Sequence, residues 1–383
     1  MRFTLSEEQQ MIQDMTRKFA KEKLIPVAAE IDKKGEFPTE IIKELGELGL
    51  LGVYVPAEYG GSDMDVVSYA IAMEEISRGC ASTGVIMSVN NSLVCDPLLK
   101  FANEEQKNKY LKPLASGEKL GCFALTEPNA GTDAIAQKTT AVKEGEYYTI
   151  NGSKNFITNA PQADYAIVFA VTDKTPVKKS RGISAFIVDM KTEGVSIGKI
   201  ENKLGIKGAS SASIIFDDVK VHESDLLAQE GMGFKIAMAT LDGGRIGIAA
   251  QALGISRAAL EEAADYSKER KQFGQSIASF QAIQFMLADM ATKVEASRLL
   301  IRESAYLKDQ KDPHFGTISA MAKLYAAETS GFVTSKAIQI FGGYGYTKDY
   351  PAERHFRDAR ITEIYEGTSE VQRMVISRAV LRD

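Results

Sequence analysis

The chain has 383 residues, of which 44% are hydrophobic and 25% charged, and its formal net charge is -5. This length suggests two or three domains and allows a large buried core. The acidic balance and the shortness of the apolar runs give no indication of nucleic-acid binding or of membrane insertion.

The chain contains three cysteines (Cys80, Cys95 and Cys122) and three histidines, and none falls in a metal-ligand spacing. We therefore expect free thiols, no metal site, and acid–base chemistry that depends on a carboxylate. The N-terminal stretch MRFTLSEEQQ has the character of neither a signal peptide nor a transit peptide. This predicts a bacterial cytoplasmic protein rather than one of the mitochondrial matrix.

Residues 1–120 show helical spacing of apolar positions, and Ser6 followed by Gln9 predicts a capping box at the start of the first helix. From about 121 to 230 the period falls towards two. The segments EYYTINGSKNFIT, DYAIVFAVT, GISAFIVDM and SASIIFDDVKV predict strands there. The order helical, β, helical argues against a doubly wound nucleotide-binding fold, and no glycine-rich loop fits a Rossmann or Walker cradle.

Helical spacing returns from 231 to 383. One apolar stripe with helical periodicity is formed by Ile283, Leu287, Met290, Val294 and Ile301.

Several short motifs are candidates for chemistry, although each has a plain structural interpretation. TEPNAGTD (126–133) is either an ordinary turn or a loop whose backbone N–H groups bind a flat polar ring or a phosphate. Arg245 in DGGRIG could simply pair with Asp242, Arg270 in ERKQFG could lie on a solvated face, and FGGYGY (341–346) could end a helix. NFITN (155–159) and IYEGTSE (364–370) complete the set.

Together and in this order, these motifs resemble those of the acyl-CoA dehydrogenase family, most of all its short-chain (butyryl-CoA) members. The resemblance covers essentially the whole chain and is most detailed over residues 74–93, 232–255 and 351–373. It implies an α+β fold with an N-terminal α-helical domain (1–120), a central β-barrel or β-sandwich domain (121–230) and a C-terminal four-helix bundle (231–383), assembled as a homotetramer.

The same resemblance implies bound FAD and an acyl-CoA substrate that is oxidised between its α and β carbons, as in butyryl-CoA to crotonyl-CoA. It also implies that the electrons pass to an electron-transfer flavoprotein. Glu366 in IYEGTSE matches the catalytic base, and we expect burial to raise its pKa. Its backbone N–H, with a flavin ribityl hydroxyl, would bind the thioester carbonyl. A structural glutamate beside a capping box of Ser369 and Gln372 is compatible with that role.

The resemblance also assigns contacts to the cofactor and the substrate. The β domain would hold the flavin ring through Phe123, Leu125, Thr126, Phe156, Ile157 and Thr158. Residues given partly by a neighbouring subunit would reach the ADP half of FAD, namely Arg270, Phe273, Gln281, Gln339, Gly342 and Gly343. Thr132, Thr368 and Glu370 match further cofactor positions. The substrate positions are Thr132, Asp242, Arg245, Tyr365 and Gly367.

The sequence departs from the family pattern at the flavin. Asn129 and Thr132 stand where relatives often carry Gly and Ser, and Thr132 keeps the hydroxyl. Phe156 stands where many relatives have Trp, and the chain contains no Trp. We expect stacking on the flavin to persist, because Phe is also flat and apolar, whereas the sequence does not predict the redox tuning at that edge.

Other functions remain open from the sequence. The enzyme could work in reverse as an enoyl-CoA reductase, within an electron-bifurcating complex, or it could prefer a branched or carboxylated acyl group. An oxidase that passes electrons to O₂ is disfavoured by the chain length. A flavin-free acyl-CoA-binding scaffold is disfavoured by the intact Glu366, Arg270 and glycines of FGG.

Overall fold

The computed structural model describes residues 4–381, and its N-terminal part is helical. The α-helices there are α1 (Glu7–Phe19), α2 (Ala28–Lys34), α3 (Thr39–Glu47), α4 (Val66–Gly79), α5 (Ala81–Ser88), α6 (Asp96–Phe101), α7 (Glu104–Gln106) and α8 (Lys112–Ala115). The predicted capping box is confirmed, because Ser6 Oγ accepts from the Gln9 amide while the Gln9 side chain accepts from the Ser6 amide, both at 3.1 Å. Helix α4 is buried on nearly every side, including at Glu74 and Glu75.

The middle of the chain forms a seven-stranded mixed sheet. Its strands are β1 (Gly121–Ala124), β2 (Thr140–Glu144), β3 (Tyr147–Thr158), β4 (Tyr165–Val171), β5 (Ile183–Asp189), β6 (Val195–Ile200) and β7 (Ser211–His222). The spatial order is β1-β4-β2-β3-β7-β6, and β5 pairs with β4. β3, β4, β5 and β7 coincide with the four predicted strand segments, whereas β1, β2 and β6 are too short to stand out from the sequence.

The sheet separates two hydrophobic cores because successive side chains of a strand point to opposite faces. Phe123 and Leu125 belong to the large core that the sheet shares with the N- and C-terminal helices. Cys122 and Ala124 belong to a second core, enclosed by the sheet itself. The segment that begins with β1 therefore lies between the sheet and the helices, which places residues 123–126 at the boundary between domains.

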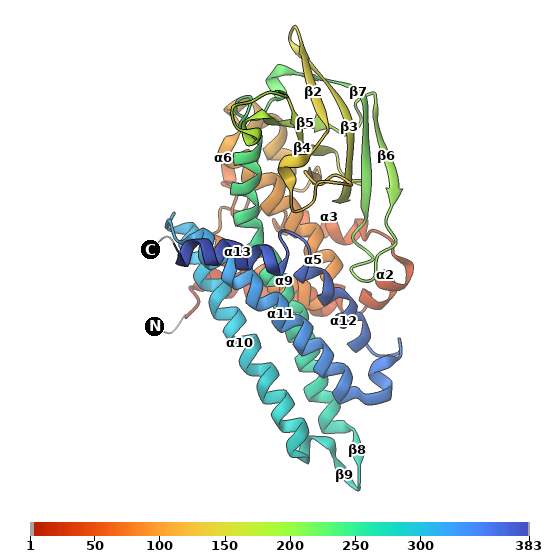
Figure 1. Ribbon diagram of the computed structural model, residues 1–383. Helices are drawn as coiled ribbons and strands as arrows, with labels where there is room; N and C mark the ends of the chain where they lie inside the picture. Colours follow the sequence, from red (N-terminus) through yellow and green to blue (C-terminus); the bar gives the residue numbers. More distant parts are fainter. Residues whose placement is uncertain (1–3, 382–383) are drawn as a thin grey trace.

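The C-terminal part is built on three long helices, α9 (Gly233–Glu269), α10 (Gln281–Asp309) and α11 (Phe315–Phe341). The short strands β8 (Lys271–Gln272) and β9 (Gln275–Ser276) form a hairpin between α9 and α10, and α12 (Ala352–Arg360) and α13 (Ser369–Val380) follow. The predicted stripe lies on α10, where Met290, Val294 and Ile301 are buried. Figure 1 shows the β8–β9 hairpin at the end of the molecule remote from the sheet.

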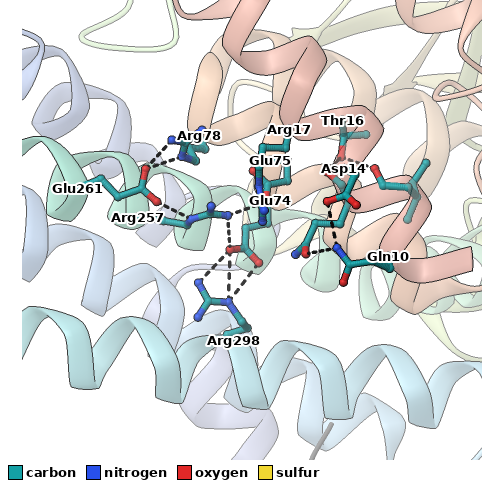
Figure 2. A network of polar contacts seen from close by, with 12 residues as sticks. Gln10, Asp14, Thr16, Arg17, Glu74, Glu75, Arg78, Arg257, Glu261 and Arg298 are labelled. Atoms are coloured by element: carbon teal, nitrogen blue, oxygen red, sulfur yellow. Dashed lines mark hydrogen bonds and ion pairs between the residues drawn. The ribbon is translucent and has the colours of Figure 1, made fainter. Parts of the chain in front are cut away.

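A network of ion pairs around two buried glutamates joins the N- and C-terminal helices (Figure 2). Glu74 on α4 accepts from Arg257 at 3.1 Å and from Arg298 at 3.0 Å, while the adjacent Glu75 accepts from Arg17 at 2.8 Å and from Arg257 at 2.7 Å. Both glutamates are at most 3% exposed. Several arginines are needed because a buried carboxylate is tolerated only when it is paired. The network fixes α1, α9 and α10 against α4.

Between residues 4 and 381, no helix is both long enough and apolar enough to cross a lipid bilayer. The first three and last two residues lie outside the described range, so the start of MRFTLSEEQQ has no structural account.

Candidate active site

The segment that carries Glu366 is a tight turn immediately before α13. Glu366 and Gly367 both have left-handed backbone conformations, with φ of 51° and 88°. A left-handed conformation is costly for a residue with a β-carbon and persists only where its surroundings enforce it. Here Gln372 donates to the carbonyl oxygens of Glu366 at 3.1 Å and of Gly367 at 2.9 Å, and Lys323 donates to that of Gly367 at 2.8 Å.

The predicted capping box of Ser369 and Gln372 is wrong. The N-cap of α13 is Thr368, whose side chain accepts from the Val371 amide at 3.3 Å. The Gln372 side chain instead faces the turn, where its Nε2 donates to the carbonyl oxygens of Glu366 and Gly367, and its Oε1 accepts no hydrogen bond from the described residues. The segment is therefore fixed from both ends, by a cap on the helix and by clamps on the turn.

The Glu366 carboxylate is buried, although two positive charges, Lys323 and Arg245, lie near it. Its Oε2 atom is buried without a hydrogen-bond partner. A β-carbon at position 244 on α9 would lie 2.3 Å from Oε2 and 2.9 Å from Leu93, so a glycine there leaves the space that the carboxylate occupies. Burial raises the pKa of Glu366 to about 7, against the opposing charges of Lys323 and Arg245. A carboxylate with a pKa near neutrality and a free oxygen is suited to proton abstraction.

Asp242 and Arg245 lie on α9 beside this carboxylate. Asp242 and Arg245 form an ion pair at 2.7 Å, which confirms the simple pairing that the sequence suggested for Arg245. Arg245 is 6% exposed, and its Nε atom has no hydrogen-bond partner within residues 4–381. Tyr365 points away from the turn and donates from its hydroxyl to Gln251, another α9 residue. The structure thus brings Asp242, Arg245 and Glu366 together, at the junction of α9, α11 and α13.

The residues predicted to hold the flavin ring lie along the boundary of the sheet and the helices. Phe123, Leu125 and Ile157 are buried, and Thr126 and Thr158 are partly buried. Phe156 differs from them, because it is 62% exposed and has a left-handed φ of 58°. A large exposed aromatic ring on a strained backbone is consistent with a surface made to contact a ligand.

The loop 126–133, which follows β1, is anchored by a buried lysine on β3. The fully buried Lys154 on β3 donates to Leu125 O at 3.1 Å, to Glu127 Oε1 at 2.8 Å and to Gln137 Oε1 at 3.0 Å. Glu127 in turn accepts from the Thr139 amide at 3.0 Å. Thr132, further along the loop, is exposed.

The third predicted group lies at the β8–β9 end of the bundle, remote from the seven-stranded sheet (Figure 1). A cavity of about 520 Å³ there is lined by Arg270, Gly342, Gly343 and Tyr344 among others. Gly342 ends α11 with φ 63° and ψ -138°, a conformation that only glycine adopts readily, and a β-carbon there would meet no atom within 4 Å. Phe273, between β8 and β9, is 93% exposed, and Gln281 and Gln339 are also exposed.

The predicted residues therefore form two separate groups within one chain. The base, the substrate positions on α9, and Thr368 and Glu370 at the start of α13 lie in the middle of the molecule, near the sheet boundary. Arg270, Phe273 and the glycines lie at the remote end. Within one chain, α9 separates these two groups.

These residues fit an FAD. The orphaned Oε2 atom, the exposed Phe156 and the glycine-lined cavity beside Arg270 offer a base, a stacking surface and an anion site. Within the described range no cluster of His, Cys, Asp and Glu has the arrangement of a metal site.

Sequence reasoning missed the residues that support the base. Gly244 and Gln251 come from α9 and Lys323 from α11, and all three contact the turn or its carboxylate, while Gln372 was named only as a cap residue. One signal was present for Lys323, a lone lysine in the small-residue run SAMAKLYAA, where a charged side chain needs a buried partner.

Comparison with known proteins agrees with this architecture over the whole chain. Three family models match consecutively: the N-terminal domain of acyl-CoA dehydrogenase over residues 6–118, its middle domain over 122–219 and its C-terminal domain over 231–381. A short-chain specific acyl-CoA dehydrogenase of Clostridium acetobutylicum is 53% identical over 382 residues, covering 100% of both chains.

Two solved structures are similar over their full length. The butyryl-CoA dehydrogenase of Megasphaera elsdenii has a TM-score of 0.97 and 49% identity, with 100% of both chains covered. A chain from a structure described as "Electron transferring flavoprotein of Acidaminococcus fermentans: Towards a mechanism of flavin-based electron bifurcation" has a TM-score of 0.98 and 54% identity, again with 100% of both chains covered. With three consecutive domain models, full-length relatives and the same three-part fold, the chain belongs to the acyl-CoA dehydrogenase family.

Proposed function

We propose that the protein is an FAD-dependent dehydrogenase of short-chain acyl-CoA thioesters that converts butyryl-CoA to crotonyl-CoA. The observation that carries this proposal is the buried Glu366 carboxylate, with an unpartnered Oε2 and a pKa raised to about 7. The similarity to a short-chain specific enzyme and to a butyryl-CoA dehydrogenase supports the choice of substrate.

Glu366 removes the proton from the α carbon of the bound thioester. Its raised pKa matches the task, because a base whose pKa lies near the working pH is both ionised and sufficiently basic. In the described part of the chain the Glu366 amide donates no hydrogen bond within the protein, so it is free to donate to the thioester carbonyl as charge develops there. When bound, the flavin supplies the acceptor for the hydride that leaves the β carbon.

The remaining roles follow from position. Thr132, Asp242, Arg245, Tyr365 and Gly367 are the proposed substrate contacts, and Arg245 adds positive charge beside the base. Phe123, Leu125, Thr126, Phe156, Ile157 and Thr158 form the proposed surface for the flavin ring, and Thr132, Thr368 and Glu370 the further cofactor contacts.

The ADP half of FAD is assigned to the β8–β9 end of a neighbouring subunit. There Arg270 suits paired phosphates because its guanidinium binds them bidentately. Phe273, Gln281, Gln339, Gly342 and Gly343 complete that proposed site. The distance between this end and the sheet within one chain supports a homotetramer in which subunits share cofactors (Figure 1).

The proposed electron acceptor is an electron-transfer flavoprotein, and the proposed location is the bacterial cytoplasm, as for a protein with close bacterial relatives. A second direction of reaction is also favoured by one observation. The Acidaminococcus fermentans structure concerns flavin-based electron bifurcation, so this chain is also a candidate for crotonyl-CoA reduction within such a complex. The same base would then return a proton to the α carbon.

Anaerobic titration of the purified yellow protein with butyryl-CoA tests the proposal, followed by the visible absorbance of the flavin. The wild type should bleach promptly, and Glu366→Gln should keep its flavin but not bleach. Glu328→Gln is the matched control, because Glu328 is an exposed glutamate on α11 that pairs with Arg373. It should bleach like the wild type. A Glu366→Gln variant that bleaches at the full rate would show that another residue is the base.

A further inference from the structure

Lys323 is a fully buried lysine that the proposed mechanism does not use. It lies on α11 with 0% exposure, among the buried alanines Ala320, Ala322, Ala326 and Ala327. Its ammonium donates to the carbonyl oxygen of Gly367 at 2.8 Å rather than to a carboxylate. Burying an ammonium without a paired carboxylate is expensive, so its presence in an apolar helix face calls for a compensating interaction.

We propose that Lys323 is a positioning residue for the catalytic base: its buried ammonium holds the turn that carries Glu366 and supplies the positive charge that keeps the Glu366 carboxylate ionised for proton abstraction. This inference rests on the proposed role of Glu366. It assigns to α11, a helix with no predicted substrate contact, a direct part in tuning the reaction.

Geometry alone does not require a lysine at this position. The Gly367 carbonyl already accepts from Gln372 at 2.9 Å, and the same amide also holds the Glu366 carbonyl at 3.1 Å. A second neutral donor would therefore satisfy the turn. What Gln372 cannot provide is a positive charge within the same low-dielectric environment, where charges act more strongly than in water.

The other charged groups around the base do not replace Lys323. Arg245 on α9 faces the carboxylate, but its charge is shared with Asp242 at 2.7 Å. Glu363 and Glu370, on the two sides of the turn, act on Lys323 with the opposite sign from Arg245 and favour its protonated form. Burial lowers the pKa of Lys323 to about 8, against the attraction of Glu366. At neutral pH the lysine thus remains largely protonated opposite a carboxyl whose own pKa is about 7.

The test compares Lys323→Met, which removes both the charge and the donor, with Lys323→Gln, which keeps a donor but not the charge. The rate of flavin bleaching by butyryl-CoA is measured against pH for each. Lys323 acts on Glu366 as an opposite charge, and a close opposite charge typically lowers a carboxyl pKa by about 1–3 units, so both variants should move the acid limb upward by about one pH unit or more. Activity should recover at high pH in Lys323→Gln.

A second readout does not depend on turnover. The infrared difference between each protein and the same protein with Glu366→Gln added reports the protonated carboxyl directly, and its titration should move upward with the loss of Lys323. Lys154→Met is the control, because Lys154 is equally buried but holds the loop after β1. It should reduce flavin retention without moving the titration of Glu366.

An unchanged titration of Glu366 in both lysine variants would overturn the proposal and leave Lys323 a structural residue. That result is distinct from a failure of the proposed function, which would appear as a wild type that does not bleach or a Glu366→Gln variant that does. If Lys323→Met does not fold, Lys323→Gln alone decides the question by the same two readouts.

Discussion

Lys154 and Glu127 form an ion pair of 2.8 Å that is closed off from solvent, with exposed side-chain fractions of 0% and 7%. The pair joins β3 to the loop that follows β1, and Lys154 also donates to Leu125 O at 3.1 Å. The ion pair therefore fixes the position of the loop relative to β3. The proposed flavin contacts lie on both of these segments: Leu125 and Thr126 on the loop, and Phe156 and Ile157 on β3. The surface offered to the cofactor depends on a buried charge pair beneath it.

Lys154→Met should weaken FAD retention. Removing one partner of a buried ion pair typically costs about 3–5 kcal/mol, because the remaining charge stays buried and unpaired. We expect loss of yellow colour on gel filtration and a lower thermal midpoint. Lys143→Met is the control, since the Lys143–Glu223 pair of 2.7 Å is about half exposed and should contribute little. Equal behaviour of the two variants would contradict this role for Lys154.

Gln372→Met should slow flavin bleaching by butyryl-CoA by about tenfold or more while leaving FAD bound. The change deletes the amide that holds the carbonyls of Glu366 and Gly367 and leaves two acceptors without that partner, a loss of about 1–3 kcal/mol. Because Gln372 is fully buried while its neighbour Arg373 lies on the exposed face of α13, Arg373→Met is a matched control. A wild-type rate in Gln372→Met would mean that Lys323 and the cap at Thr368 suffice to hold the turn.

Glu366 should make the stability of the protein depend on pH in a defined direction. Burial raises its pKa from 4.5 to about 7, so the folded state binds the proton more tightly than the unfolded state does. Its contribution to stability is therefore fully present below pH 4.5 and is lost as the pH rises through 7. At 1.36 kcal/mol per pH unit the loss is up to about 3 kcal/mol.

Thermal midpoints of the wild type and Glu366→Gln between pH 5 and 8.5 measure this effect. The variant lacks the titrating group. Its thermal midpoint should therefore rise relative to that of the wild type as the pH increases. Glu328→Gln, at an exposed position, should show a constant difference from the wild type. A constant difference for Glu366→Gln as well would mean that the carboxyl is not held in an unfavourable environment.

Mixing two inactive variants should restore activity if subunits share cofactors. Arg270→Gln should lose FAD affinity by about tenfold or more, because a charge-assisted contact to phosphate is worth about 1.5–3 kcal/mol. A subunit with Arg270→Gln keeps Glu366, and a partner with Glu366→Gln keeps Arg270, so one site of such a pair is intact at limiting FAD. Co-expression of the two variants and measurement of butyryl-CoA-dependent bleaching tests this.

Lys268→Gln is the control for that experiment, since Lys268 lies near Arg270 at the end of α9 but pairs only with the exposed Asp265, at 2.8 Å. It should retain FAD. Absence of recovery in the mixed protein would place Arg270 and Glu366 at the same cofactor of one chain, contrary to their separation in the fold.

The sequence by itself determined the order of helical and β segments, because periodicity is a local property. It also determined the capping box of Ser6 and Gln9, since both partners lie within one turn. The same kind of local reasoning failed at Ser369 and Gln372, because Thr368 caps α13 and the Gln372 amide donates to the carbonyls of the preceding turn. A cap pattern predicts a cap only when no other group competes for its residues.

Only the tertiary structure decided the environment of the base. Position 244 on α9 and Lys323 on α11 meet the segment of Glu366 from distant parts of the sequence, and no spacing rule connects them to it. The raised pKa is a consequence of desolvation, and desolvation exists only once these helices have packed together. The separation of Arg270 from Glu366 is likewise set by the length and direction of α9, which carries one group away from the other.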